Sequence, residues 1–326
     1  MISGCSHNIH ISVCICTYKR TRQLGRLLET LQQQNTGGMF SYSLIITDND
    51  ASQSAKPVVD AFSALSSIPA IYCVEPEQNI ALARNKAIAQ SSGDFIAFID
   101  DDEIPENSWL IELLRTCLSH HAAGVLGPVK PFFEHKPASW IIDGHFFERP
   151  RHKTGFKIGA SDARTGNVLL RREILDGLKD VFRPQFSSGG EDVDFFKRMA
   201  EKKLLFVWCD EAVVHELVPP ERCKYSYLLR AALLRGNNNN KSKNNKILLL
   251  LKSVIAIPSY LILLPFLAIS SRSGFIKFSI KLFDHTGRIL AFLGLNPVHT
   301  RYVTKKNGRS PEIQVEVIKH DNFSKP

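Results

Sequence analysis

The sequence is poor in sulfur-containing and indole side chains, with three methionines, three tryptophans and seven cysteines in 326 residues. The cysteines are odd in number, and no two of them have the C-x-x-C spacing of a zinc or thiol redox site. Several lie in apolar runs such as VCIC and LFVWC, where a thiol behaves as a small apolar group. We therefore expect reduced, buried cysteines, as in cytosolic proteins, and no disulfide framework.

The N-terminus lacks the basic segment followed by an apolar segment that marks a signal peptide. Its first apolar stretch, residues 9–16 (IHISVCIC), is short and rich in β-branched residues, which is typical of a strand. The sequence therefore predicts no signal peptide.

Acidic residues are scarce in the last third of the chain. Residues 221–326 contain 18 basic and 5 acidic residues, a net charge of +13, whereas residues 1–220 contain 23 basic and 27 acidic residues, a net charge of −4. This asymmetry indicates a near-neutral body with a basic appendage that meets phosphate groups, either of nucleic acid or of anionic lipid.

Strand and helix patterns alternate at short spacing over the first hundred residues. Leucines at 24, 27, 28 and 31 have the spacing of an amphipathic helix. The predicted strands are 9–16, 42–47, 70–74 and 94–99, and the predicted helices are 20–35, 55–65 and 80–91. This order predicts an α/β fold with a doubly wound, mostly parallel, Rossmann-like sheet. Ligands of such sheets bind beyond the carboxyl ends of the strands, where Thr17, Asp48 and Asp100 converge.

The second half is more irregular. It has helical patterns at 107–121 and 191–202 and short strand patterns at 124–129, 166–172, 204–208 and 212–214. An asparagine run at 237–240 is typical of a polar linker. We therefore predict a body over 1–236, a linker over 237–246 and an apolar, basic, helical tail over 247–326.

Residues 247–270 contain 18 apolar residues of 24 and a single charge, Lys252. This length is sufficient to cross a membrane, but Pro258 and Pro265 make a re-entrant or in-plane arrangement equally compatible. The alternative is a buried helix pair formed with the amphipathic pattern at 275–295. We favour membrane contact because basic residues flank both sides. These residues are Lys241, Lys243, Lys246, Arg272, Lys277 and Lys281.

Three consecutive acids, Asp100, Asp101 and Asp102, follow the fourth predicted strand. If the strand geometry continues, Asp100 and Asp102 lie on one side and form, with phosphate oxygens, a site for Mg²⁺ or Mn²⁺. The alternative is a solvated acidic turn.

Other candidate residues are ambiguous when taken singly. Glu191 and Asp192 follow two glycines and open a helix, which fits either a general base or simple pairing with the helix dipole. His215 follows a strand and is a metal ligand, a phosphate contact or a structural histidine. Arg84 and Arg222 either bind a diphosphate or form surface ion pairs.

Seven fragments together carry a family resemblance. They are CTYKR (16–20), TDNDAS (47–52), QNIALARN (78–85), FIDDDEIP (98–105), TGNVLLRR (165–172), GGEDVDF (189–195) and VVHELVPPER (213–222). In this order they resemble the inverting glycosyltransferases of family 2, which have the GT-A fold. They are similar in particular to the bacterial branch that builds exopolysaccharide, capsule or lipopolysaccharide, over about residues 9–235.

The resemblance implies how a nucleotide-sugar donor is held. Thr17 and Tyr18 match residues that contact the nucleoside, and Asp48 matches the acid that binds the base, usually uracil. Because the common D-D-G-S element reads D-N-D-A-S here, Asp50 is a second candidate for the base.

The resemblance also implies the catalytic groups. Asp100 and Asp102, with Asp101 between them at the donor site, match the D-x-D element that holds Mn²⁺ or Mg²⁺ on the diphosphate. Asp192 matches the base, beside Glu191. Asn167 lies in the loop facing the acceptor, and His215 matches an additional metal ligand of some members.

Taken together, these features predict metal-dependent sugar transfer from a UDP-sugar to a saccharide or lipid-linked acceptor in cell-envelope polysaccharide synthesis. The expected place is the cytoplasmic face of the inner membrane. Two alternatives are a non-catalytic, lectin-like or scaffolding relative and a sugar nucleotidyltransferase, although CTYKRTRQLG lacks the glycine-rich phosphate loop of the latter. Nucleic acid is not an expected partner, because the basic residues of the tail alternate with a long apolar stretch rather than with stacking aromatics.

Overall fold

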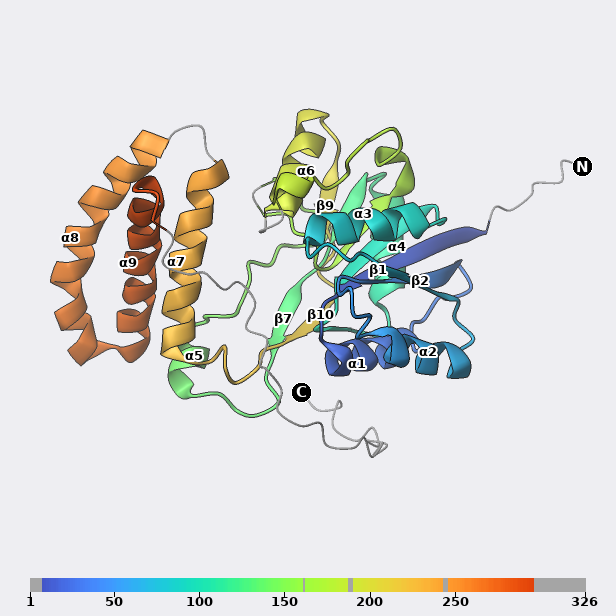
Figure 1. Cartoon of the computed structure of the whole chain (residues 1–326), viewed down its shortest axis with the longest axis horizontal. Coiled ribbons are helices and arrows are strands. Elements are labelled where there is room, and N and C mark those ends of the chain that lie inside the picture. Colours follow the sequence, from blue (N-terminus) through green and yellow to red (C-terminus); the bar gives the residue numbers. More distant parts are fainter. Residues whose placement is uncertain (1–7, 161, 187–189, 243–245, 296–326) are drawn as a thin grey trace, which may run out of the picture.

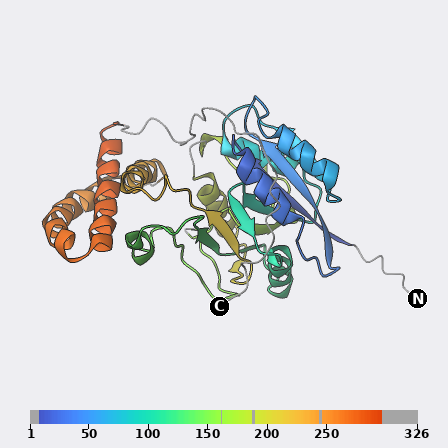
Figure 2. The same ribbon diagram turned by 90° about the horizontal axis from the view of Figure 1, so that it is seen from below.

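The computed structural model describes residues 8–160, 162–186, 190–242 and 246–295. It shows an α/β body and, beside it, a layer of three long helices (Figures 1 and 2). The main sheet of the body has the strand order β3-β2-β1-β4-β8-β6-β9, and a smaller sheet has the order β5-β10-β7.

Most strands of the main sheet run in the same direction. Strand β8 is antiparallel to both of its neighbours, and the other pairs are parallel. The strands are β1 (Ile9–Thr17), β2 (Phe40–Asp48), β3 (Ala70–Val74), β4 (Phe95–Asp100), β6 (Gly124–Leu126), β8 (Val168–Arg171) and β9 (Phe206–Trp208). The small sheet consists of β5 (Glu103–Pro105), β7 (Val129–Phe132) and β10 (Val214–Leu217).

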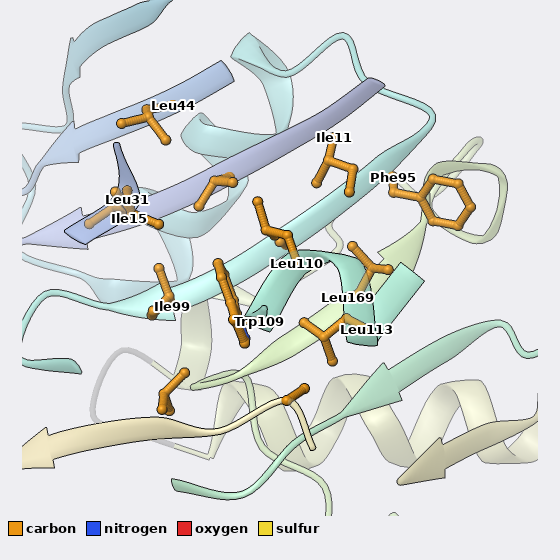
Figure 3. Close-up of a cluster of buried hydrophobic side chains, with 14 of the residues drawn as sticks. Ile11, Ile15, Leu31, Leu44, Phe95, Ile99, Trp109, Leu110, Leu113 and Leu169 are labelled. Atoms are coloured by element: carbon orange, nitrogen blue, oxygen red, sulfur yellow. The ribbon is translucent and has the colours of Figure 1, made fainter. Parts of the chain in front are cut away.

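Helices cover both faces of the main sheet, as a doubly wound fold requires. Alternate β1 residues enter different cores: Ile11, Val13 and Ile15 pack in one, and Cys14 packs in the other. Figure 3 shows part of the first core, where Trp109 lies near Ile99 and Ile15 lies beside Leu31. The helices of the body are α1 (Thr21–Leu31), α2 (Lys56–Leu65), α3 (Ile80–Gln90), α4 (Trp109–Ser119), α5 (Ser139–Asp143) and α6 (Glu191–Glu201), with 3-10 turns at Arg172–Ile174 and Pro184–Phe186.

The described cysteines are unpaired, as expected. Cys14, Cys117 and Cys209 are buried. Burial raises the pKa of the Cys117 and Cys209 thiols to about 11, so both stay protonated at neutral pH.

The helical layer contains α7 (Tyr225–Ser242), α8 (Lys246–Ser270) and α9 (Arg272–Phe292), with α9 between the other two (Figure 1). Two glycines allow α7 and α9 to touch backbone to backbone. A Cβ atom on Gly236 would lie 2.1 Å from the Asp284 carbonyl oxygen, and one on Gly287 would lie 2.3 Å from the Leu233 carbonyl oxygen. Small residues at a helix crossing permit this close approach.

The structure differs from the predicted division at residue 236. Helix α7 continues through the asparagine run to Ser242, because its packing against α9 supplies the stability that the local sequence lacks. The helical layer therefore begins near Tyr225 rather than after a linker. Of the predicted linker and tail, residues 243–245 and 296–326 lie outside the described residues.

We predict that Gly287→Ala separates α7 from α9 and lowers the stability of the chain by about 1–3 kcal/mol, because the methyl group overlaps a backbone oxygen. The matched control is Gly25→Ala, whose added Cβ meets only Val58 at 3.7 Å. Thermal unfolding followed by circular dichroism should show a lower midpoint for Gly287→Ala alone. Equal midpoints in both variants would contradict the close helix contact.

Candidate active site

The carboxyl ends of β1, β2 and β4 meet at one edge of the main sheet. Thr17 pairs with Asp48 in the register of β1 and β2, and Cys16 pairs with Asp100 in that of β1 and β4. The expected convergence of Thr17, Asp48 and Asp100 at one edge is therefore confirmed.

The acidic segment turns immediately after this edge. Strand β4 ends at Asp100, and β5 begins at Glu103 in the other sheet, so the strand alternation expected for Asp100 and Asp102 does not continue. Asp101 is 3% exposed and accepts hydrogen bonds of 2.8 Å from both Thr17 Oγ1 and Arg20. Burial raises the pKa of Asp101 to about 6, although Arg20 opposes this rise. Its carboxylate thus fastens the turn to β1.

Asp102 lies between two arginines. Its Oδ2 atom is 3.1 Å from Arg20 and 3.5 Å from Arg222. Arg222 also bonds Glu216 at 2.8 Å, and Glu216 accepts a second bond from Arg149. The structure therefore brings Arg222 to the acidic turn, where it forms ion pairs with Asp102 and Glu216.

Arg84, on α3, connects the acidic turn to α6. The residue is only 7% exposed, donates a hydrogen bond to Glu191 and lies 3.6 Å from Asp100. The ring of Phe182 lies 5.6 Å from its guanidinium carbon. Two segments far apart in the sequence thus meet at one buried cation.

The two acids at the start of α6 have different surroundings. Glu191 is 4% exposed, and burial raises its pKa while Arg84 lowers it. Its Oε2 atom has no hydrogen-bond partner among the described residues. Asp192 is half-buried and accepts a bond of 2.7 Å from the Val193 amide. Glu191 therefore holds Arg84, and Asp192 is the more accessible carboxylate.

Glu103 lies in the motif FIDDDEIP, but the sequence alone does not predict a role for it. It is 1% exposed, its Oε2 atom accepts a 3.0 Å bond from the Asp100 amide, and burial raises its pKa well above the usual range. Its Oε1 atom has no partner in the described part of the chain. A Cβ atom on Gly166 would lie 3.0 Å from that oxygen and 3.2 Å from Asp100 Oδ2. Glycine at 166 therefore leaves room for both carboxyl groups.

Of the two predicted base-binding acids, Asp48 ends β2 and Asp50 lies in the loop that follows. Asp48 is fully buried and accepts bonds from the Ala55 amide at 2.8 Å and the Tyr72 hydroxyl at 2.9 Å. Asp50 accepts a 2.6 Å bond from the Ser52 hydroxyl, which helps to lower the pKa of Asp50 despite its burial. Tyr72 is a second residue that sequence reasoning missed, because nothing local to β3 reveals its partner.

Tyr18, assigned to the nucleoside, directly follows Thr17 at the end of β1 and is half-buried. The Lys19 ammonium lies 5.2 Å from the centre of its ring.

Asn167, assigned to the acceptor loop, turns its side chain into the protein. It is 2% exposed, accepts a bond from Trp109 Nε1 at 2.8 Å, and donates to the carbonyl oxygens of Pro128 at 3.0 Å and Ala212 at 2.8 Å. These bonds occupy the amide, so Asn167 positions its loop rather than presenting its side chain to a ligand.

His215 lies apart from the acidic turn. Its Nε2 atom is 3.3 Å from Glu106, whereas Glu216, the next residue of β10, faces Arg222. Neighbouring residues of a strand point to opposite faces, which explains this separation. The structure therefore does not bring His215 to Asp100 and Asp102.

The donor set at the turn is compatible with a hard divalent cation. Within the described residues no three His, Cys, Asp or Glu side chains form a metal cluster. Mg²⁺ commonly binds through one or two carboxylates together with substrate phosphates, which is the set that Asp100 and Asp102 offer. Asp100 is suitable because its side chain is 49% exposed.

A pocket of about 320 Å³ lies beside this site. It reaches Gly166, which borders Asp100 and Glu103. Its lining also includes Arg149, His152, Arg164 and Trp208. Charged and aromatic side chains of this kind suit a polar ligand with an apolar face, such as a sugar.

Comparison with known proteins decides the family. The model of glycosyl transferase family 2 matches residues 12–178. The chain is also 34% identical over 235 residues to succinoglycan biosynthesis protein ExoM of Rhizobium meliloti, covering 71% of this chain and 74% of ExoM. The chain belongs to glycosyltransferase family 2.

A further relative agrees with this family. This chain is 30% identical over 196 residues to glycosyltransferase AglE of Haloferax volcanii, and the match covers 59% of this chain and 61% of AglE. Residues 1–349 of S. aureus TarS, solved with UDP, match with a TM-score of 0.50 at 16% identity, covering 90% of this chain and 95% of that one. The sheet with its two helical faces is thus the GT-A fold of the family.

We predict that Asn167→Gly lowers the free energy of unfolding of the glycosyltransferase by about 2–4 kcal/mol, because Trp109 and two carbonyl groups lose their partners. Asn167→Ala should cost about 1 kcal/mol more, since φ is +70° here and a Cβ atom disfavours that conformation. Urea unfolding measures both. Wild-type stability in the glycine variant would show that the hydrogen bonds contribute nothing.

Proposed function

We propose that this glycosyltransferase transfers a sugar from a UDP-sugar, with inversion and with a divalent metal, to a saccharide or lipid-linked acceptor of a cell-envelope polysaccharide. The observation that carries the proposal is the Arg84 bridge, which joins Asp100 of the acidic turn to Glu191 at the start of α6, next to Asp192. The co-crystallised UDP and UDP-GlcNAc of TarS and the succinoglycan role in the name of ExoM support the choice of donor and product.

Three arginines surround the place where a diphosphate would lie. Arg20, Arg84 and Arg222 all contact acids of the turn. A Mn²⁺ or Mg²⁺ ion held by Asp100 and Asp102 would neutralise charge on the departing nucleoside diphosphate. Arg222 is suited to assist, because Glu216 holds its guanidinium at 2.8 Å and its second contact, with Asp102, is long at 3.5 Å.

Asp192 acts as the general base in this proposal. It takes the proton from the acceptor hydroxyl while that oxygen forms a bond to the anomeric carbon and the diphosphate leaves with the electrons of the broken bond. One in-line displacement inverts the anomeric centre, so no carboxylate nucleophile is needed. Glu191, buried against Arg84, keeps Asp192 in place.

The acceptor sugar occupies the pocket next to Gly166, and the helical layer brings the enzyme to the membrane surface. Within the part of the chain that the structure describes, one helical stretch, Ile247–Ser270, is long and apolar enough to cross a membrane, with a mean hydropathy of 2.3. This arrangement gives the enzyme access to both a cytosolic donor and a lipid-linked acceptor. The cytoplasmic face of the inner membrane is the corresponding location.

We predict that Asp192→Asn lowers sugar transfer by about 100- to 10,000-fold and leaves UDP binding unchanged, because the amide cannot accept the acceptor proton. Transfer is followed by release of UDP from a panel of UDP-sugars, and binding by calorimetry. Loss of UDP binding in a folded Asp192→Asn variant would overturn the assignment of the base.

We predict that Mn²⁺ strengthens UDP binding at least about tenfold and that Asp102→Ala removes this gain, since the carboxylate supplies a metal ligand. Asp60→Ala is the matched control, because Asp60 is an exposed acid of α2 that pairs with Lys56 on the same helix. Calorimetric titrations with Mn²⁺ and with a chelator make the comparison. Equal affinities in both buffers would refute the metal requirement.

A further inference from the structure

Helix α8 exposes apolar side chains around most of its circumference. Only 6% of its most apolar 18-residue window is buried. A narrow stripe faces α9, where Ser253 bonds His285 at 3.0 Å and the Tyr260 ring packs against Phe278. The exposed residues include Leu251, Val254, Ile255, Leu261, Ile262, Phe266 and Ile269. Contiguous exposed apolar side chains of this kind mark a surface that meets a membrane or another protein.

Helix α9 is fixed between α8 and the body. The glycine contacts and two hydrogen bonds from Arg235 to Asp284, of 2.8 and 3.0 Å, tie it to α7. Ile276 packs with Trp140 of α5, and the Arg272 guanidinium carbon lies 5.9 Å from the same indole ring. The depth of α8 in a membrane therefore determines the depth of α9 and, through α9, that of α7.

This coupling decides between the two possible orientations of α8. If α8 crossed the bilayer, the Phe278 contact with Tyr260 would place Lys277 and Lys281 of α9 near the bilayer centre, where each charge is strongly disfavoured. Arg235 and Asp284 would follow them. If α8 lies in the membrane plane, it immerses by about 10 Å, one helix diameter, and α9 stays at the level of the headgroups.

We infer that α8 lies in the plane of the membrane, immersed in one leaflet, and that Lys277 and Lys281 of α9 contact anionic lipid headgroups. Both lysines are exposed, and the region carries the positive charge of the chain. Lys252, the one charge within residues 247–270, reaches the interface with its ammonium group. This inference rests on the membrane part of the proposed function and specifies its geometry.

The depth of α8 tests the orientation. Leu251→Trp, Leu261→Trp and Ile269→Trp place indoles along its exposed face. The full chain is bound to phosphatidylcholine–phosphatidylglycerol vesicles whose acyl chains carry bromine near the headgroup or near the methyl end. Shallow bromine should quench the three added indoles equally, above the wild-type signal. Strongest quenching of Leu261→Trp by deep bromine would mean that α8 spans, and would overturn the inference.

Vesicle sedimentation tests the lipid contact. Lys277→Ala and Lys281→Ala should each weaken binding to phosphatidylglycerol-containing vesicles about fivefold, without an effect on phosphatidylcholine alone. Leu251→Glu with Leu261→Glu should abolish binding, whereas Leu65→Glu, at an 87% exposed position of α2, should not.

Two further measurements distinguish failure of the membrane inference from failure of the proposed donor. If the wild-type chain binds neither kind of vesicle and sediments as a dimer, α8 packs against a second copy of the chain, which overturns the inference. UDP titration of Leu251→Glu/Leu261→Glu reports on the catalytic body alone. Intact UDP binding with lost vesicle binding supports separate sites for donor and lipid. Absent UDP binding in the wild type would refute the proposed donor and leave the depth measurement valid.

Discussion

The buried guanidinium of Arg84 is the interaction on which the arrangement of the site depends. A buried arginine is tolerated only with carboxylate partners, and here the partners are Asp100 at the end of β4 and Glu191 at the start of α6. Removing Arg84 would leave Glu191 as an uncompensated buried charge. The position of α6, and with it that of Asp192, therefore depends on the ion pair between Glu191 and Arg84 rather than on the local sequence around residue 191.

The acids of the site divide by burial into two kinds. Asp48, Asp101, Glu103 and Glu191 are almost inaccessible, and their carboxyl groups bond to the loops and strands around them. Asp100 and Asp192 keep part of their surface accessible. Each accessible acid adjoins a buried one in sequence, so the buried member fixes the backbone from which the accessible side chain extends.

Much of the fold could be predicted from the sequence, because its causes are local. The β-branched run at residues 9–16 and the leucine spacing in residues 20–35 match β1 and α1 closely. The convergence of Thr17, Asp48 and Asp100 required only that parallel strands end at one edge. Motif order identified the family, since no single fragment carried enough information.

The roles of several residues depended on distant partners and could not be predicted. Asn167 forms hydrogen bonds with Trp109 and with two carbonyl groups from other segments. Tyr72 of β3 donates a hydrogen bond to Asp48 of the neighbouring strand β2. The asparagine run has the composition of a linker, yet α9 holds it as helix near Gly236. His215 was placed by motif alone, and the alternation of β10 turned it toward Glu106.

A short segment joins the two halves of the molecule. Arg222 contacts Asp102, and three residues later Tyr225 begins α7, the first helix of the layer. The acidic turn therefore contacts the chain only three residues before the helical layer begins. For the membrane placement proposed above, the shortness of this connection would set how far from the lipid surface the acidic turn stands.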